Sequence, residues 1–163
     1  MKNSITFTRL NKEDKEQWLP QLFDLFYENM QAIVLSDLPY EQQKQQWLGE
    51  VSPALEKAPR QIVLYFVNDT LAGYVQYYTN QNLLMIEEIQ IKKAYQHTTL
   101  FYGVCKHLAT ALPADLETIE AFALKQNLNS RKLMQKLGMT QIDEDETFVH
   151  LRGFVQDIKR FFQ

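Results

Sequence analysis

The hydrophobic and polar positions of this chain follow two different periods, and the change of period marks the predicted elements. Residues 4–10 alternate between apolar and polar side chains, which predicts a strand. Between Trp18 and Val34, and again between Pro39 and Lys57, apolar residues return every three or four positions, as they do on amphipathic helices. We expect Pro20 to break the first of these stretches, because proline removes a helical hydrogen bond.

The middle of the chain returns to strand patterns. Residues 61–67 (QIVLYFV) form a continuous apolar run, typical of a strand buried on both faces, and residues 71–79 follow as its hairpin partner across a turn at 68–70. The remaining predicted elements are a strand over 83–92, a helix that starts near Thr98 and Thr99, a strand over 118–124, a helix over 127–137, a hairpin of 139–142 with 147–151, and a tail helix over 154–162. In the tail helix we expect Phe154, Ile158 and one of the last two phenylalanines to pack inward.

This element order, β-αα-β-β-β-α-β-α-β(β), predicts an α/β (α+β) fold with one central mixed sheet and helices on both of its faces. No repeat, linker or low-complexity segment interrupts it, so we expect residues 1–163 to form a single domain. The composition agrees, because 45% hydrophobic and 23% charged residues are the balance of a soluble globular protein.

Several classes of function are disfavoured by the sequence. It has no apolar stretch of the roughly 18 residues that a membrane span needs. Its first residues have no apolar signal-peptide core, so we expect a cytoplasmic protein without membrane contact. One cysteine, Cys105, and three separated histidines offer neither a disulfide framework nor a metal site. The net charge of -3 argues against general nucleic-acid binding.

The charge is unevenly distributed along the chain. Residues 92–138 carry seven basic and three acidic side chains, a net charge of +4, within a chain whose total is -3. Two interpretations stay open for this basic segment: a solvated helix face, or a site for a small polyanion such as a phosphorylated cofactor.

Three segments, together with the element order, resemble the GNAT N-acyltransferase superfamily between Ile5 and Leu151. The segment VNDTLAGYVQY resembles the family's strand-turn-strand, with Gly73 at the family's glycine position. The segment IEEIQIKKAYQHTTLFYGVCKHL is similar to the family's acyl-CoA segment, in which a strand leads into a Q/R-x-x-G-x-G/A loop that opens a helix. Residues 127–139, NLNSRKLMQKLGM, are similar to the family's N-x-x-A-x-x-L-Y-x-K-L-G-F helix, the most specific of the three patterns.

The resemblance implies acetyl-CoA as the cofactor and assigns its contacts. A helix N-terminus presents N–H groups and a positive dipole end to a pyrophosphate, and the strand before it offers backbone groups to the pantetheine arm. The implied contacts are Ile89 and Ile91 on the strand, Gln96, His97, Thr98, Thr99, Leu100 and Phe101 in the loop, and Asn127 and Ser130 on the later helix.

Departures from the family pattern at three positions bear on cofactor binding and catalysis. Thr99 and Phe101 stand where the family has glycine or alanine, and no glycine lies between Lys92 and Tyr102. Either the amides of this loop still bind phosphate, helped by the threonine hydroxyls, or coenzyme A binding is weak or lost. Met134 stands where many members have a tyrosine that protonates the departing thiolate, and methionine cannot donate a proton.

Acyl transfer to an amine needs a group that accepts the amine proton. Glu87 and Glu88 are adjacent on a predicted strand, so their side chains face opposite sides of it. The resemblance favours Glu88 as the general base, and the alternative is that Glu88 only holds the strand or a neighbouring side chain. The predicted acceptor contacts are Tyr27, Asp37 and Tyr40 in the first helical region.

The sequence therefore predicts an N-acetyltransferase that moves an acetyl group from acetyl-CoA to a primary amine of a small molecule or peptide. The alternative is a catalytically degenerate GNAT domain that serves as a CoA-binding or protein-binding regulatory module, which the missing glycines and tyrosine favour. A longer acyl chain or a hydroxyl acceptor also fits the sequence. Because members of the family often pair through sheet edges or C-terminal strands, we also expect a homodimer.

Overall fold

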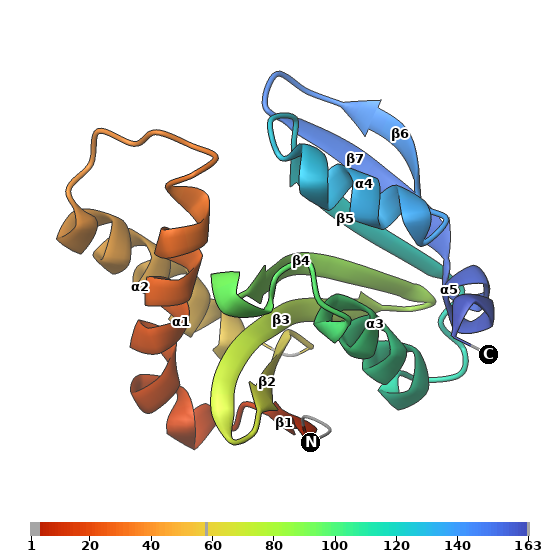
Figure 1. The fold of residues 1–163 in the computed structure, drawn as a ribbon, viewed down its shortest axis with the longest axis horizontal. Coiled ribbons are helices and arrows are strands. Elements are labelled where there is room, and N and C mark those ends of the chain that lie inside the picture. The colour runs from red at the N-terminus through yellow and green to blue at the C-terminus, as the bar shows by residue number, and fades with distance from the viewer. Residues whose placement is uncertain (1–3, 58, 163) are drawn as a thin grey trace. The chain divides into compact units, whose positions relative to one another are not determined.

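A seven-stranded mixed sheet and five α-helices make up the described part of the chain, residues 4–57 and 59–162 of a computed structural model (Figure 1). The sheet order is β1-β2-β3-β4-β5-β7-β6. The strands are β1 (Ile5–Arg9), β2 (Gln61–Val67), β3 (Thr70–Asn80), β4 (Leu83–Ile91), β5 (Thr118–Leu124), β6 (Thr140–Glu144) and β7 (Phe148–Phe154). The helices are α1 (Lys15–Met30), α2 (Tyr40–Glu56), α3 (Leu100–Ala111), α4 (Leu128–Lys136) and α5 (Val155–Phe161). The α/β class and the element order predicted from the sequence are confirmed.

Contacts within the chain define two compact units. Unit 1 comprises residues 1–76 and 88–97, and unit 2 comprises residues 77–87 and 98–163. The boundary falls inside β3 and inside β4, so each of these strands contributes residues to both units.

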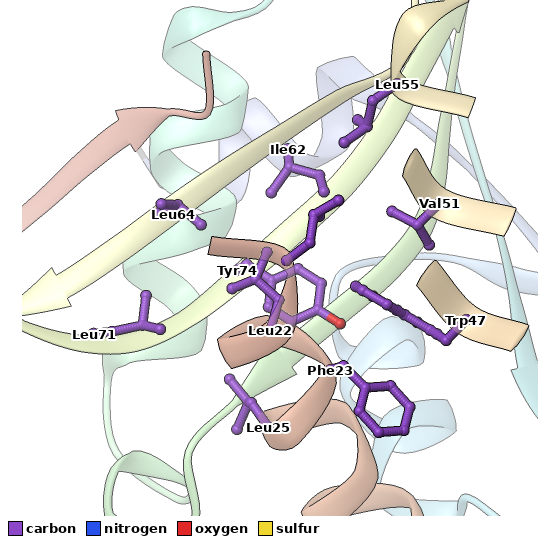
Figure 2. Close-up of a cluster of buried hydrophobic side chains, with 11 residues drawn as sticks. Leu22, Phe23, Leu25, Trp47, Val51, Leu55, Ile62, Leu64, Leu71 and Tyr74 are labelled. Atoms are coloured by element: carbon purple, nitrogen blue, oxygen red, sulfur yellow. The ribbon is translucent and has the colours of Figure 1, made fainter. Parts of the chain in front are cut away.

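The core of unit 1 brings together helices α1 and α2 and strands β2 and β3 (Figure 2). Its buried residues come from all four of these elements: Leu19, Leu22, Phe23, Leu25, Trp47, Val51, Leu55, Ile62, Leu64, Leu71 and Tyr74. Aromatic rings fill its centre, where Phe23 and Trp47 have ring centroids 5.8 Å apart. This cluster explains the helical spacing of the apolar residues, because the spacing places them on the faces that α1 and α2 bury.

Pro20 does not break α1, which runs continuously from Lys15 to Met30. The expected break was therefore wrong. The side chains next to the proline are completely buried, with Leu19 2% exposed and Leu22 and Phe23 0% exposed. Burial of each such side chain stabilises the fold by about 1.5–3 kcal/mol. Together they outweigh the roughly 3 kcal/mol that an internal proline costs a helix.

The hairpin between β2 and β3 has the tight turn that the sequence predicts. Asn68 and Asp69 have φ angles of 49° and 63°, in the left-handed region. Two consecutive residues with positive φ form a two-residue turn. The twist of such a turn matches the twist of the two strands that it connects. Asn and Asp are among the few residues other than glycine that adopt this conformation at low cost.

Unit 2 contains the only parallel pairing among those described, between β4 and β5, in which Leu83 pairs with Thr118 and Ile86 with Ala121. Strand β7 then pairs antiparallel with both β5 and β6, and the register with β6 shifts between Gln141 and Asp143. The expected hairpin of β6 and β7 is confirmed.

The tail forms the predicted helix, α5, but only part of its expected packing is observed. Phe154 is 58% exposed and Phe161 is 52% exposed, so the inward packing expected for Phe154 was wrong. Ile158 is buried as expected, and Val155 is buried as well. Phe154 is exposed because it is the last residue of β7 and its side chain follows the alternation of the strand. Phe161 stacks on Tyr102 of α3, with ring centroids 5.7 Å apart.

Among the described helices, none combines the length and the apolar character needed to cross a membrane. In the same residues, no group of three or more His, Cys, Asp or Glu side chains is placed to hold a metal ion.

Candidate active site

Glu88 lies on β4, in the part of the strand that belongs to unit 1, and two donors hold its carboxylate. The Tyr74 hydroxyl donates to Glu88 Oε1 at 2.6 Å, and Gln90 Nε2 donates to the same oxygen at 3.2 Å. Burial, with Glu88 alongside, raises the pKa of Tyr74 well above its ordinary value. The hydroxyl of Tyr74 therefore stays protonated, and remains a donor to Glu88, throughout the physiological pH range.

Tyr74 connects this carboxylate to the core of unit 1. Its side chain is 0% exposed and its ring lies among the core residues (Figure 2). A ring fixed by packing has few alternative rotamers, so its hydroxyl is aimed at Glu88 by the core itself.

Gly73 allows Tyr65 to pass close to β3 and β4. The buried Tyr65 hydroxyl donates to the carbonyl oxygens of Tyr74 at 2.6 Å and of Gln90 at 2.8 Å. A Cβ atom on Gly73 would lie 2.1 Å from the Gln90 carbonyl oxygen and 2.3 Å from Tyr65 Cε2. Only glycine fits this close approach, which gives a physical reason for the glycine noted in the sequence.

Three side-chain amides, those of Gln90, Asn29 and Gln96, form an amide chain that ends at Glu88. Gln90 donates to Glu88, and its own Oε1 accepts from Asn29 Nδ2 at 2.8 Å. Asn29 Oδ1 accepts from Gln96 Nε2 at 3.2 Å. Asn29 Nδ2 and Gln96 Nε2 also donate to the Ile91 carbonyl oxygen, at 3.0 and 2.9 Å. All of these residues belong to unit 1.

The loop expected to bind pyrophosphate follows the amide chain directly. His97 has a φ angle of 62°, and His97, Thr98 and Thr99 are exposed. Thr99 occupies the N-cap position of α3, while Thr98 Oγ1 accepts from the Leu100 N–H at 3.2 Å. Leu100 and Phe101 are 2% and 7% exposed, so their side chains belong to the core and only their backbone can contact a ligand.

Asn127 is the N-cap residue of α4, in unit 2. Its Oδ1 accepts from the Ser130 N–H at 3.1 Å, which satisfies one of the unpaired donors of the helix start. Asn127 therefore caps this helix, and cofactor contact by Asn127 and Ser130 stays a prediction. Gly138 follows α4 with a φ angle of 85°, as expected for the residue that ends a helix.

Met134, which cannot donate a proton, and three side chains that could protonate a leaving thiolate are placed as follows. Met134 of α4 is buried at 7% exposure. Burial raises the pKa of the Cys105 thiol to about 12, so Cys105 does not ionise near neutral pH. His150 Nε2 lies 2.7 Å from Glu120 Oε2, and Tyr102 stacks on Phe161.

The expected acceptor residues lie in the α1–α2 region of unit 1, but they are only partly brought together. Tyr27 and Tyr40 meet edge to face, with ring centroids 4.9 Å apart. The Tyr40 hydroxyl donates to Asp24, and Lys44 Nζ donates to the Tyr40 oxygen at 3.0 Å. Asp37 is exposed in the segment between the two helices.

Sequence reasoning named Glu88 and Gln96 as candidates, but it did not name Asn29, Gln90, Tyr65 and Tyr74, which the structure places around them. The sequence did contain one indication of Gln90, because it is a polar residue inside a largely apolar strand and a buried polar side chain needs hydrogen-bond partners. Glu87 and Ile89, the neighbours of Glu88 on β4, are partly buried, and their roles stay predictions.

Known proteins resemble this chain in their three-dimensional structure and not in their sequence. No protein-family model and no curated protein matches the chain. PaiA N-acetyltransferase from Thermoplasma acidophilum, solved in complex with coenzyme A, matches with a TM-score of 0.71 at 16% identity, over 93% of this chain and 99% of that one. A protein from Desulfovibrio desulfuricans described as a GNAT-family acetyltransferase matches with a TM-score of 0.69 at 13% identity, over 93% and 99% of the two chains. A variant of the spermidine N-acetyltransferase SpeG from Vibrio cholerae matches with a TM-score of 0.64 at 12% identity, over 98% of both.

These matches extend over nearly the whole of both chains in each pair, so they concern the complete fold and not one motif. The chain therefore has the GNAT fold, as its sequence resemblance implied.

Proposed function

We propose that this protein is an acetyl-CoA-dependent N-acetyltransferase that acts on a primary amine of a small molecule or peptide. The observation that carries the proposal is the GNAT fold, shared over 93% of the chain with an N-acetyltransferase solved with coenzyme A. The described residues add a partly buried carboxylate, Glu88, held by hydrogen bonds in the strand where the sequence predicts the general base.

The start of α3 supplies donors suited to the pyrophosphate of the cofactor. The N–H groups of Phe101 and Tyr102 belong to the first turn, where helix geometry provides no acceptor, whereas Gly103 N–H already bonds to the Thr99 carbonyl at 3.1 Å. His97, Thr98 and Thr99 are exposed before this turn, and Thr98 and Thr99 add hydroxyls. The residues present therefore fit an anionic group without the glycines of the family pattern.

Coenzyme A, when bound, supplies the acetyl group as a thioester. Glu88 accepts the proton of the acceptor amine, directly or through one water molecule, and leaves the amine neutral and nucleophilic. Tyr74 and Gln90 fix Glu88 Oε1 for this task. The amine is the acceptor class we favour, and the spermidine N-acetyltransferase among the structural neighbours acts on one.

The test is a kinetic comparison of Glu88→Gln with the exposed control Glu50→Gln on α2. General-base catalysis contributes about a hundredfold or more, so Glu88→Gln is expected to lower kcat by about that factor while leaving acetyl-CoA affinity near wild type. Equal kcat values for Glu88→Gln and the wild type would remove Glu88 from the mechanism. The assay screens a panel of primary amines and follows the release of free thiol.

A second candidate function is a degenerate GNAT domain that binds coenzyme A or a protein partner without catalysis. The specific observations are Thr99 and Phe101 in the place of the loop glycines and Met134 in the place of the usual tyrosine. In this case acetyl-CoA binds but no amine in the panel is acetylated, or acetyl-CoA does not bind at all.

We also propose that residues 1–163 act as one functional domain and that the protein forms a homodimer. Support for the dimer comes from unit 2, where Phe122, Ile142 and Phe154 are 53%, 43% and 58% exposed on the neighbouring strands β5, β6 and β7. Light scattering measures the molar mass directly, and a monomer at micromolar concentration would contradict the dimer. The expected location in the cytoplasm stays a prediction.

A further inference from the structure

We propose that Asn29 and Gln90 are positioning residues, and that the amide chain couples Gln96, at the start of the predicted phosphate loop, to the carboxylate of Glu88. The catalytic consequence rests on the proposed function, because it requires Glu88 to act as the base. The coupling itself is a property of unit 1 and can be tested without any enzymatic activity.

The amide chain is continuous in space although its members are far apart in sequence. Asn29 stands at the end of α1, 61 residues before Gln90. The three hydrogen bonds of the amide chain, from Gln90 to Glu88, from Asn29 to Gln90 and from Gln96 to Asn29, measure 3.2, 2.8 and 3.2 Å. Each of them is at least partly buried. Gln90, the central strand residue, is 8% exposed, so water has little access to its amide.

The direction of every amide in the chain is fixed from its surroundings. An ionised carboxylate has only acceptors, so Gln90 must turn its NH2 group to Glu88 and its oxygen to Asn29. The Ile91 carbonyl oxygen is likewise only an acceptor, so Asn29 and Gln96 must both turn their NH2 groups to it. These two constraints agree, because they leave Asn29 Oδ1 facing the NH2 group of Gln96 and Asn29 Nδ2 facing Gln90.

In each of the three links between Gln96, Asn29, Gln90 and Glu88, the donating N–H group therefore lies on the side away from Glu88 and points toward it. Reversing any one amide would bring two oxygens or two NH2 groups together, and the neighbouring amide would have to turn as well. A change in the orientation of the Gln96 amide therefore alters the hydrogen bond at Glu88 Oε1. By linkage, a change at Glu88 alters the orientation of the Gln96 amide.

Gln96 connects the amide chain to the predicted phosphate loop. Its side chain is engaged by Asn29 and by Ile91, and the next residue, His97, turns the backbone into the left-handed region before α3 begins. A ligand that moves the backbone at Gln96 also moves its side-chain amide and so disturbs its hydrogen bond to Asn29. Through the amide chain, binding at the loop then changes the hydrogen bonding of the Glu88 carboxylate.

The first test is heteronuclear NMR of the isotope-labelled full chain. In Glu88→Gln we expect the side-chain NH2 resonances of Gln90, Asn29 and Gln96 all to shift, although of these three amides it is Gln90 that donates directly to residue 88. In the double variant Asn29→Ala, Glu88→Gln, compared with Asn29→Ala alone, the Gln96 resonances should no longer respond. If Glu88→Gln shifts Gln90 but leaves Gln96 in place, the coupling does not exist.

The second test is kinetic and uses Asn29→Asp, which removes the donor to Gln90 and adds an acceptor, so that Gln90 is drawn to present its oxygen to Glu88. We expect kcat to fall by roughly ten- to a hundredfold, the scale of a misplaced catalytic group, with the KM for acetyl-CoA changed far less. Asn80→Asp, the same change at an exposed position on β3, should leave both constants near wild type. Equal kcat values in Asn29→Asp and Asn80→Asp would overturn the positioning role.

The two tests separate the failure of each claim. If no amine is acetylated by the wild type, the proposed function fails, while the NMR experiment still decides the coupling. If Asn29→Asp does not fold, Asn29→Ala takes its place in the kinetics, with a fall in kcat expected and an unchanged kcat contradicting the proposal.

Discussion

Replacement of Gly73 by alanine adds a methyl group where the structure of unit 1 leaves no room for one. The added Cβ atom would lie 2.1 Å from the Gln90 carbonyl oxygen and 2.3 Å from Tyr65 Cε2, whereas ordinary contacts begin near 3.4 Å. The carbonyl belongs to the backbone of β4 and the ring atom to a tyrosine that is 0% exposed, so neither can turn aside. The strands must separate by about 1 Å or more at this point.

The expected cost follows from two contributions. Overpacking a filled core costs roughly 1–3 kcal/mol. Displacement of Tyr65 also weakens its hydrogen bonds to the Tyr74 and Gln90 carbonyls, and an unsatisfied buried partner costs about 1–3 kcal/mol. We therefore expect Gly73→Ala to lower the free energy of unfolding by about 2–6 kcal/mol, a large fraction of the roughly 5–15 kcal/mol of a typical domain.

The assay is urea denaturation at fixed temperature, followed by far-ultraviolet circular dichroism. Gly49→Ala is the matched control, because no atom lies within 4 Å of a Cβ at that position of α2. Alanine is the better helix former, so the control should be about 0.5–1 kcal/mol more stable than the wild type. A Gly73→Ala protein within about 0.5 kcal/mol of the wild type would refute the reasoning from close approach.

Three further changes test other parts of the account. Thr99→Glu places a negative charge at the start of α3 and should weaken acetyl-CoA binding roughly tenfold or more, whereas Thr110→Glu near the other end of the helix should not; equal affinities in calorimetry would contradict the loop assignment. Asn127→Ala removes the acceptor of the Ser130 N–H and should cost about 1 kcal/mol in urea denaturation; an unchanged midpoint would show that the cap contributes nothing. Burial raises the pKa of Glu120, but hydrogen bonds from Arg152 and His150 outweigh it and the net pKa is lowered from 4.5. Glu120 therefore contributes stability above pH 4.5 that is lost as the pH falls through its lower folded pKa. Glu120→Gln should be about 1 kcal/mol less stable at pH 7 and should approach the wild type in acid; a pH-independent difference would exclude this linkage.

Much of the fold was predictable because local patterns and burial agree. Strands β2 and β5 have the bounds that their apolar runs predict, and the turn at Asn68 and Asp69 follows from residues that tolerate positive φ. Pro20 shows where local rules fail, since the buried leucine and phenylalanine side chains around it keep α1 intact. The inward packing expected for Phe154 was wrong for a related reason, because Phe154 is the last residue of strand β7 and not a residue of helix α5.

The candidate site was less predictable than the fold. Glu88 and Asn127 were named as candidates from the resemblance to the GNAT superfamily, and a carboxylate in a mostly apolar strand also needs a partner or a task. Asn29 could not be found, since its partners lie 61 to 67 residues away and only the folded chain brings them together. The left-handed conformation of His97 was also beyond local rules, because its sequence neighbours contain no glycine that would mark a turn.

The most direct test of the central claim is the binding of acetyl-CoA to the chain of residues 1–163, measured by titration calorimetry with Thr99→Glu as the reference variant. A micromolar Kd for the wild type, weakened in Thr99→Glu, is the predicted result, and it would show that a loop without glycine still binds the cofactor. No heat of binding at millimolar acetyl-CoA would contradict an acetyl-CoA-dependent enzyme.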